Sequence, residues 1–398
     1  MSRPGPVAGN GGNLIVMSAR TGPGVRNIQK DAFMSTAGKK VHVALSERSY
    51  DIEIGAGNLD QIGRLTTDCT RVTHAIVMTD ANVERPHAQI VGESLAATGA
   101  EVDLVVVEPG EPSKSVETSF QLWKKMLELG ADRKSVVVAA GGGVVGDLAG
   151  FIAATYGRGL SFVQAPTSLL AQVDSSVGGK VGINLPGAKN MVGAFWQPLN
   201  VLIDVDTLKT LPDREYRSGL AEVVKYGVIL DAEFFAYLET NVDELNNRDP
   251  EVLIEIVTKS CRLKADVVEA DERETLGLRA VLNYGHTFAH AFESSCGYGE
   301  LLHGEAVSIG MLCASRLAER LGRIDAQATR RQFDLLAALQ LPVDVPDADH
   351  QELLAIMQRD KKVEHGRLRY ILPSKIGAVE LVGDVGPGDA LASLCASE

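Results

Sequence analysis

The first half of the chain alternates strand-like and helix-like patterns. Residues 41–55 hold two runs of alternating apolar and polar positions around a polar turn, which predicts a β-hairpin. Continuous apolar runs then predict buried strands, each followed by a stretch with helical spacing; these runs begin at His74, Glu101, Ser135 and Ser161. Because strands of this kind that alternate with helices are typical of a parallel sheet covered on both faces, we predict an α/β domain.

Helical spacing dominates from about Thr207, and only residues 368–382 again have the pattern of strands. We therefore predict a disordered or extended N-terminal tail (1–38), an α/β domain with a parallel sheet (39–204) and a mainly α-helical domain (205–398). A length of 398 residues fits two domains, since single cores seldom grow beyond about 250–300 residues. The sequence from Met34 onward is typical of the start of a natural protein, so we expect part of the tail to be absent from the natural protein; whether residues 1–33 belong to it stays open.

The composition excludes several classes of protein. The net charge is −13, from 52 acidic and 39 basic residues, which argues against a general nucleic-acid or anionic-membrane partner. The five cysteines show no paired spacing, so we expect reduced thiols and a cytoplasmic protein. No apolar run reaches the roughly 18 residues of a membrane helix, and the tail has none long enough for a secretory signal.

A glycine-rich polar stretch, residues 174–196, interrupts this apolar chain. It carries two lysines and has almost no periodicity that would place it on a long helix or strand. Glycines let the backbone approach a ligand closely, and lysines suit phosphate or carboxylate groups. We predict a ligand-binding loop here; the alternative is a flexible surface connection.

A second glycine motif, residues 141–146, satisfies GxGxxG between a predicted strand and a predicted helix. Glycines at this point let backbone N–H groups and a helix N-terminus meet a pyrophosphate. The acidic residue expected about 20 positions later in a Rossmann fold is missing. Acidic residues do follow the earlier strands, at Asp80, Glu108 and Glu111, where a ribose could bind. The motif alone leaves open nucleotide binding and a tight structural turn.

Histidines suggest a metal site in the helical half. His286 and His290 lie four residues apart on one predicted helix face, and such a pair is structural more often than it binds metal. His303 and Glu222 occur in other predicted helices and would complete a site with two histidines and one carboxylate. Spacing alone would pair His286 with His290.

Several cations lie in apolar or glycine-rich surroundings, where together they could line one anionic pocket. Each taken separately is better explained as a solvated surface residue. They are Lys180, Lys189, Lys225, Lys264, Arg279, Lys361 and Lys362.

Long segments of the chain resemble the 3-dehydroquinate synthase family of the shikimate pathway. The matching segments, in the family's order, are residues 141–159, 164–184, 187–198, 211–227, 271–274, 278–293, 301–311 and 360–362. The resemblance covers about residues 40–390 and is far more specific than any one motif. It implies a dehydroquinate synthase-like fold, an NAD-binding first domain, a metal- and substrate-binding second domain, and a homodimer.

The resemblance also implies the reaction, a lyase-type cyclisation. The substrate would be 3-deoxy-D-arabino-heptulosonate 7-phosphate, which has a phosphate and a carboxylate. Its C5 hydroxyl would be oxidised by bound NAD+, phosphate would be eliminated, the ketone would be reduced again, and an aldol closure would give 3-dehydroquinate. A divalent metal, zinc or cobalt, would polarise the C5 oxygen. NAD would be recycled rather than released.

Family roles carry over to matching positions. The metal ligands would be Glu222, His286 and His303, with His290 outside the ligand set. The residues expected to act in catalysis are Asp174, Lys180, Lys225, Glu274 and His290. Lys264 and Arg279 would bind the substrate carboxylate, with Asp174 and Lys225 on the ring hydroxyls. The phosphate end would meet Lys180, Asn190, Asn283, His290, Lys361 or Lys362, and Arg158 from the partner subunit.

The NAD site implied by the resemblance gathers many short segments. Its residues would be Asp80, Asn82, Glu111, Lys114, Gly142, Gly143, Val144, Asp147, Thr167, Ser168, Lys189, Thr207, Leu208, Lys209 and Thr210.

Three alternative functions differ in class. Another sugar phosphate cyclase, such as a valiolone or deoxyinosose synthase, shares the chemistry, but its substrate has no carboxylate for Lys264 and Arg279. A metal-dependent polyol dehydrogenase of similar fold would release NADH and would leave the lysine-rich stretches without a phosphate. A binding or scaffold protein without activity would not need this set of residues.

Overall fold

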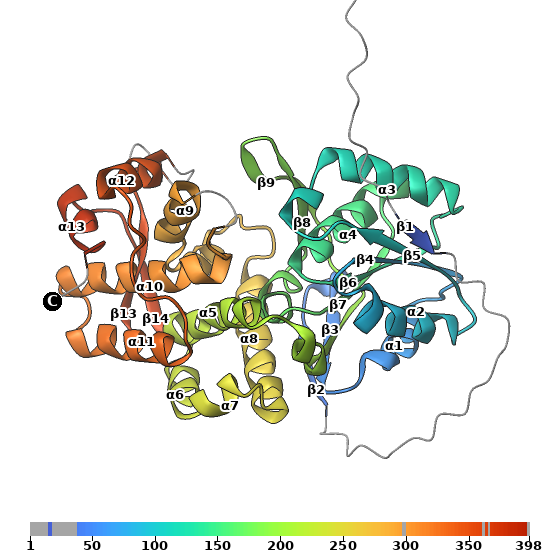
Figure 1. Ribbon diagram of the computed structural model, residues 1–398, viewed down its shortest axis with the longest axis horizontal. Helices are drawn as coiled ribbons and strands as arrows, with labels where there is room; N and C mark the ends of the chain where they lie inside the picture. Colours follow the sequence, from blue (N-terminus) through green and yellow to red (C-terminus); the bar gives the residue numbers. More distant parts are fainter. Residues whose placement is uncertain (1–14, 18–37, 297–299, 360–362, 365–366, 396–398) are drawn as a thin grey trace, which may run out of the picture.

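The computed structural model describes residues 15–17, 38–296, 300–359, 363–364 and 367–395. An α/β part and a helical part lie side by side along the long axis of the molecule, and α5 leads from one to the other (Figure 1). The predicted fold class is confirmed.

The α/β part is built on one eight-stranded sheet with the order β1-β5-β4-β6-β7-β10-β3-β2. The strands from β5 to β3 are parallel, whereas β1 and β2 pair antiparallel at the two edges. Their bounds are β1 Ile15–Met17, β2 Lys39–Val43, β3 Tyr50–Gly55, β4 His74–Asp80, β5 Glu101–Val107, β6 Val136–Gly141, β7 Ser161–Pro166 and β10 Asn200–Asp204. The predicted hairpin at residues 41–55 is therefore confirmed as β2 and β3, while the sequence analysis missed β10.

Helices cover both faces of this sheet, as its continuous apolar strands predict. Two separate apolar clusters fill the two interfaces, one including Leu122 and Leu148, the other including Ile62 and Val91. The helices are α1 Ile62–Cys69, α2 Gln89–Ala96, α3 Val116–Glu128 and α4 Gly143–Thr155.

Most of the stretch predicted as a glycine-rich loop is instead a β-hairpin, so the loop assignment was wrong for residues 180–195, while ligand binding there stays a prediction. Its strands are β8 Lys180–Leu185 and β9 Ala188–Phe195. A Cβ at Gly193 would meet the carbonyl oxygen of Val181 at 2.3 Å, and one at Gly182 would meet that of Val192 at 2.8 Å. These glycines let the two backbones approach closely, and they hide the apolar alternation by which a strand is recognised.

The C-terminal part is helical apart from small hairpins. Its helices are α5 Asp213–Leu230, α6 Ala232–Thr240, α7 Val242–Asn246, α8 Pro250–Ala270, α9 His286–Ser295, α10 His303–Arg320, α11 Ala326–Ala338, α12 His350–Arg359 and α13 Pro387–Ala392. The strand-like stretch near the end forms β13 Tyr370–Lys375 and β14 Ala378–Val382, beside short β11 Val363–Glu364 and β12 Arg367–Leu368. Among the described residues, no helix combines the length and the apolar character needed to cross a lipid bilayer.

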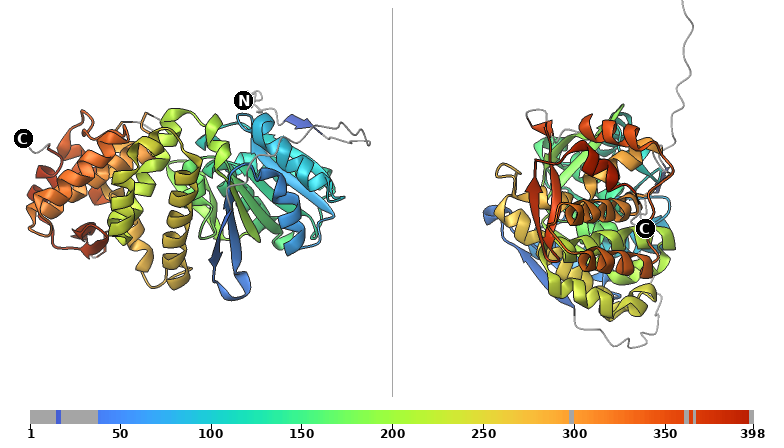
Figure 2. Two further views of the ribbon diagram at one scale, coloured as in Figure 1. Left: turned by 90° about the horizontal axis from the view of Figure 1, so that it is seen from below. Right: turned by 90° about the vertical axis from the view of Figure 1, so that its left-hand side faces the viewer.

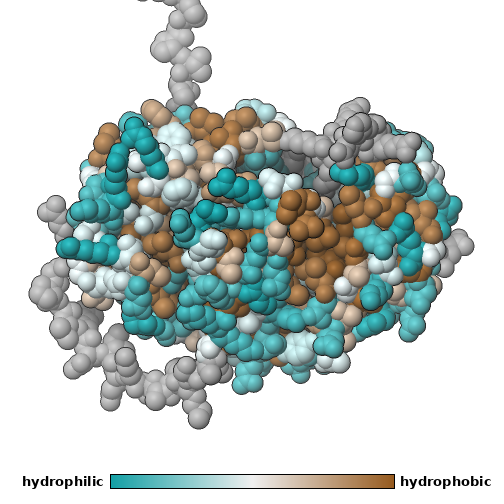
Figure 3. Space-filling model, turned by 180° about the vertical axis from the view of Figure 1, so that it is seen from behind, coloured by the Kyte–Doolittle hydropathy of each residue, from teal (hydrophilic) through white to brown (hydrophobic). Residues whose placement is uncertain are grey.

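The two parts share one hydrophobic core. Ile52 and Ile203 from the sheet belong to the same buried cluster as Val257 and Leu312 from the helices. The β2–β3 hairpin lies against α8, as Figure 2 shows. Apolar residues also gather on the face of the helical part that Figure 3 shows. Exposed large apolar side chains of the C-terminal part include Leu276, Leu278 and Leu381. The shared core fixes the orientation of the helices that carry the predicted metal ligands relative to the sheet.

Candidate active site

A cavity of about 1080 Å³ is bordered by residues from both parts. The carboxyl ends of the parallel strands form one wall, which is where open α/β sheets bind ligands. Residues 187–190, at the tip of the β8–β9 hairpin, residues 210–212 with Glu215 of α5, and residues from α9 and α10 line the remainder. The lining residues that the sequence analysis named are Asp80, Asn82, Glu111, Lys114, Gly142, Gly143, Val144, Asp147, Thr167, Ser168, Asp174, Lys189, Asn190, Thr210, His290 and His303.

The glycine motif forms a tight turn at the N-terminus of α4. Gly142 precedes the helix, and its own Cβ would lie 3.4 Å from Ser168 Oγ. A Cβ at Gly141 would meet Val145 at 2.7 Å. The turn therefore needs small residues, and it directs the free N–H groups of the helix toward the cavity, which favours an anion such as a pyrophosphate.

Of the acidic residues that follow the strands, Asp80 and Glu111 line the cavity where a sugar could bind, whereas Glu108 does not. Asp80 ends β4, and its Oδ1 accepts the backbone N–H of Asn82 at 2.8 Å. Burial raises the pKa of Asp80. Thr210 lines the cavity, whereas Thr207, Leu208 and Lys209 do not.

Lys114 links three residues of this cavity wall through hydrogen bonds and ion pairs. Its ammonium contacts Asp147 at 2.7 Å, Asn190 Oδ1 at 2.5 Å and Glu111 at 3.3 Å. Burial raises the pKa of Asp147, although the charge of Lys114 opposes that shift. Asn190 lies at the hairpin tip with a positive φ of 53°, and its side-chain oxygen accepts the hydrogen bond from Lys114. The cation thus joins the hairpin to the loop that follows β5.

Three predicted metal ligands converge at the other side of the cavity, where His303 lines it and Glu222 and His286 lie behind its wall. The ligand atoms of Glu222, His286 and His303 all lie within 4.8 Å of one another. Glu222 Oε1 is 3.6 Å from His286 Nε2 and 3.7 Å from His303 Nε2. Lys225 forms an ion pair with Oε2 of Glu222, whereas Oε1 has no hydrogen-bond donor among the described residues. A buried carboxylate oxygen without a donor, facing two imidazole nitrogens, fits a divalent cation.

The Nδ1 atoms of His286 and His303, which face away from Glu222, also have hydrogen-bond partners. His286 Nδ1 lies 3.0 Å from the carbonyl oxygen of Tyr284, and His303 Nδ1 lies 3.4 Å from Glu293 Oε1. Burial, with the charge of Lys225, lowers the pKa of His286 well below its usual value. Burial opposes the charged form of His303 too, but Glu293 and Glu222 outweigh it and raise that pKa. Outer hydrogen bonds of this kind leave Nε2 facing the cation.

His290 lies next to the three predicted metal ligands but is not one of them. Its ring is 5.7 Å from the ring of His286, nearly perpendicular to it, and it lines the cavity. The structure therefore brings together the three residues that the resemblance implies, and not the pair that spacing alone would choose.

A second charged group lies behind the cavity wall. Lys264 donates to Asp174 Oδ1 at 2.7 Å and to its carbonyl oxygen at 2.6 Å, and Tyr226 donates to Oδ1 at 2.8 Å. Although burial acts in the opposite direction, the charges of Lys264 and Lys225 hold the pKa of Asp174 well below its ordinary value. Burial lowers the pKa of Lys264. Asp174 is thus kept ionised at the edge of the cavity.

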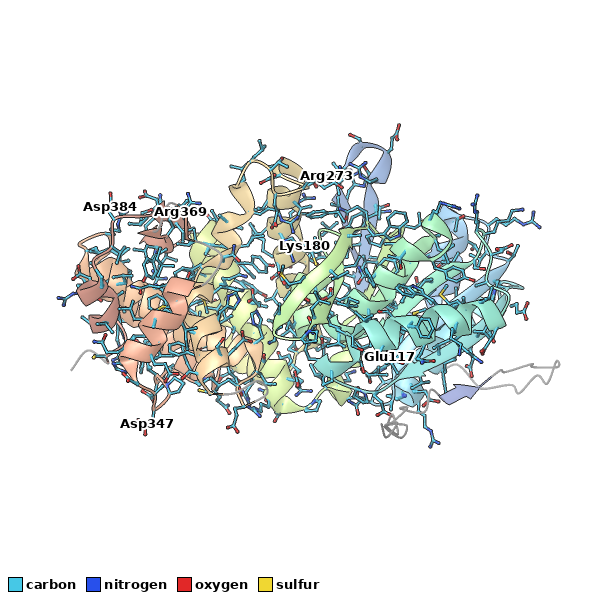
Figure 4. The ribbon with its side chains drawn as sticks, turned by 90° about the horizontal axis from the view of Figure 1, so that it is seen from above. Glu117, Lys180, Arg273, Asp347, Arg369 and Asp384 are labelled. Carbon is cyan, nitrogen blue, oxygen red and sulfur yellow. The ribbon has the colours of Figure 1, made fainter. Side chains whose placement is uncertain are left out.

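Glu274 links two further predicted cations. It forms an ion pair with Lys180, the first residue of β8, and its Oε1 is 3.4 Å from Nε of the buried Arg279. Figure 4 shows Lys180 between the two parts of the molecule. These three residues contact one another but do not line the cavity. Two others lie apart from it as well, the exposed Arg158 and the half-buried Asn283, and Lys361 and Lys362 lie outside the described residues.

Comparison with known families decides among the alternatives. The model for the N-terminal part of 3-dehydroquinate synthase matches residues 104–218, and the model for its C-terminal part matches residues 219–363. The chain belongs to the 3-dehydroquinate synthase family. A relative from Rhodopirellula baltica named 3-dehydroquinate synthase is 50% identical over 367 residues, which is 90% of this chain and 97% of that one. One from Desulforamulus reducens with the same name is 48% identical over 355 residues, 89% and 99% of the two chains.

Solved structures extend the similarity to neighbouring cyclases of this superfamily. A 2-epi-5-epi-valiolone synthase from Streptomyces hygroscopicus, with NAD+ and Zn²⁺ bound, has a TM-score of 0.80 and 30% identity over 88% of this chain and 97% of that one. A 2-deoxy-scyllo-inosose synthase complexed with carbaglucose-6-phosphate, NAD+ and Co²⁺ has a TM-score of 0.81 and 26% identity over 89% and 99%. Glycerol dehydrogenase from Schizosaccharomyces pombe, at 17% identity, shares the fold alone.

Sequence analysis of this family member missed some cavity residues. Glu293, Glu215 and Ser175 line the cavity, and only the structure singles them out. Glu293 ends a segment that resembles the family, but a carboxylate seven residues after His286 carries no signal of its own. The contact with His303 depends on how α9 and α10 pack.

Proposed function

We propose that this protein is a 3-dehydroquinate synthase that converts 3-deoxy-D-arabino-heptulosonate 7-phosphate to 3-dehydroquinate and phosphate, and is thus a phosphate-eliminating lyase. The observation that carries the proposal is the single cavity that joins the Gly142–Gly143 turn to His290 and His303. A dinucleotide site and a metal site facing the same space suit one small hydroxyl-bearing substrate. The relatives at 48–50% identity support this assignment over the cyclases at 26–30%.

The residues present fit both expected cofactors. Glu222, His286 and His303 would hold zinc or cobalt, and Gly142, Gly143 and the N-terminus of α4 would hold the NAD pyrophosphate. When bound, NAD would exchange a hydride with the substrate and the divalent ion would polarise the reacting oxygen.

The chain's own side chains would bind the substrate and move its protons. Lys264 and Arg279 would meet the carboxylate, for which a guanidinium offers paired donors. Asn190, Lys180 and Asn283 would meet the phosphate end. His290, which lines the cavity next to the metal ligands, would take up and return protons at the reacting carbons.

Glu274 is a second candidate for proton transfer. It has a positive φ of 56°, an uncommon conformation for a non-glycine residue, and it bridges Lys180 and Arg279. Asp174 and Lys225, both in charged clusters beside the cavity, would bind the ring hydroxyls.

The proposal includes a cytoplasmic homodimer. Arg158 is exposed and does not line the cavity of its own chain, which agrees with a role in the partner's site. Exposed apolar side chains on the same part of the molecule, Val116, Phe120 and Leu127 on α3, would favour association.

Phosphate release tests the activity. The purified protein with zinc and catalytic NAD+ should release one phosphate per heptulosonate phosphate without net NADH. Release only from sedoheptulose 7-phosphate would move the protein to the valiolone-type cyclases. Steady NADH accumulation from a polyol would identify a dehydrogenase instead.

A further inference from the structure

Glu293 occupies a distinctive place in the cavity wall. It lies on α9, two turns after His286, and 12% of its side chain is exposed. Its Oε1 is 3.4 Å from His303 Nδ1, the nitrogen that faces away from Glu222. This geometry is that of a carboxylate that orients a metal-binding imidazole from behind.

The two histidines differ in what holds them. His286 Nδ1 contacts a backbone carbonyl oxygen, that of Tyr284, at 3.0 Å. Among the residues that the structure describes, the partner of His303 Nδ1 is instead a side-chain carboxylate, that of Glu293, and His303 is the first residue of α10. The ring of His303 also keeps 34% of its side-chain surface exposed, against 11% for His286. Packing therefore restrains His303 less, and its orientation depends more on Glu293.

The same oxygen reaches across to the α/β part. Glu293 Oε1 lies 3.8 Å from Nζ of Lys189, which belongs to β9. Lys189 is half exposed, so this longer ion pair contributes little energy by itself. The same carboxylate oxygen of Glu293 therefore faces both His303 and the ammonium group of Lys189.

We propose that Glu293 is a positioning residue that fixes the tautomer and ring orientation of His303 for the metal. Its carboxylate accepts the Nδ1 proton, which leaves the Nε2 lone pair directed at the cation beside Glu222. This inference rests on the metal site of the proposed function, but it concerns metal affinity and not turnover. Removal of such an outer partner typically weakens metal binding about 10–100-fold.

Zinc affinity measured by chelator competition tests this role. Metal-free protein carrying Glu293→Ala should bind zinc about 10–100-fold more weakly than the wild type. Glu293→Gln keeps an oxygen that accepts the Nδ1 proton but has no charge, so its loss should be intermediate. Glu319→Gln, which removes a carboxylate near the other end of α10, is the matched control and should bind zinc like the wild type.

Lys189→Met and the stability of the metal-free variants separate positioning from general damage. Lys189→Met removes the other partner of the same oxygen and should change zinc affinity less than Glu293→Ala. Urea unfolding of the metal-free Glu293→Gln protein should remain a single cooperative transition, because the substitution preserves shape and removes only the charge that faces His303 and Lys189. Wild-type zinc affinity in Glu293→Ala, or an equal loss in Lys189→Met, would overturn the inference. Wild-type protein that binds zinc but releases no phosphate would refute only the proposed function.

Discussion

Ser218 of α5 accepts the backbone N–H of Gly304 of α10 through its hydroxyl, at 3.0 Å. The same glycine lies so close to α5 that a Cβ on it would be 1.8 Å from the Ser218 carbonyl oxygen. Glu222 follows Ser218 by one helical turn, and His303 precedes Gly304. The closest approach of the two helices therefore fixes the distance between two predicted metal ligands.

Gly304→Ala should disturb the metal site through this contact. The added methyl must push α10 away from α5, with an overpacking cost of about 1–3 kcal/mol. We expect a lower urea midpoint and weaker zinc binding by the same variant. Gly388→Ala is the control, since a Cβ at Gly388 would have nothing within 4 Å. Unchanged zinc affinity in Gly304→Ala would show that α5 and α10 adjust without separating the ligands.

Arg48→Ala should impair substrate binding from a distance. Arg48 makes two hydrogen bonds to Glu272, at 2.6 and 3.0 Å, and the carbonyl oxygen of Glu272 accepts from Arg279 Nη1 at 3.0 Å. Loss of this support should raise KM for the heptulosonate phosphate several-fold, roughly up to 10-fold, with a smaller effect on kcat. Steady-state kinetics would measure both.

The control for Arg48 is another exposed arginine in an ion pair. Arg64 pairs with Asp68 on α1, and neither residue lines the cavity. Arg64→Ala should leave KM unchanged. A similar rise in both variants would mean that Arg48 does not act through Glu272.

Asp174→Asn should lower stability in a pH-dependent way. The pKa of Asp174 is held below its ordinary value of about 3.9, so its stabilising effect is present above about pH 4 and is lost as the pH falls further. At neutral pH the substitution should cost about 2 kcal/mol, between the values for exposed and buried ion pairs. Urea unfolding between about pH 3 and pH 7 would show the difference from wild type shrinking at the acid end. A constant difference would contradict the ion pair with Lys264.

Cysteine labelling should distinguish buried from exposed thiols. Burial raises the pKa of Cys261 and Cys313 to about 12, so near pH 8 only about one in ten thousand of these thiols is ionised. Iodoacetamide should modify the exposed Cys395 in the native protein and spare these two until urea is added. Peptide mass spectrometry would read the pattern. Native labelling of Cys261 would reveal opening between α8 and residues 171–175, whose Gln172 carbonyl accepts its thiol.

Much of the fold follows from local pattern, because valine-rich runs and helical spacing are local signals. The hairpin of β8 and β9 was missed since Gly182 and Gly193 serve a backbone contact that periodicity does not record. The metal group came from family resemblance, as spacing favoured His290. The contact that brings Glu222 to His303 lies between helices far apart in the sequence. Glu293 was missed for the same reason.

The junction between the two family models falls between residues 218 and 219, inside α5 (Asp213–Leu230). The halves therefore meet within a continuous helix, and the residues on both sides of that point pack into one core. Two fragments separated at this point would each expose the apolar side chains that form the shared core. Chimeras that join the two halves of different relatives at residue 218 should therefore be less stable than either parent, and evolution should keep the two halves together.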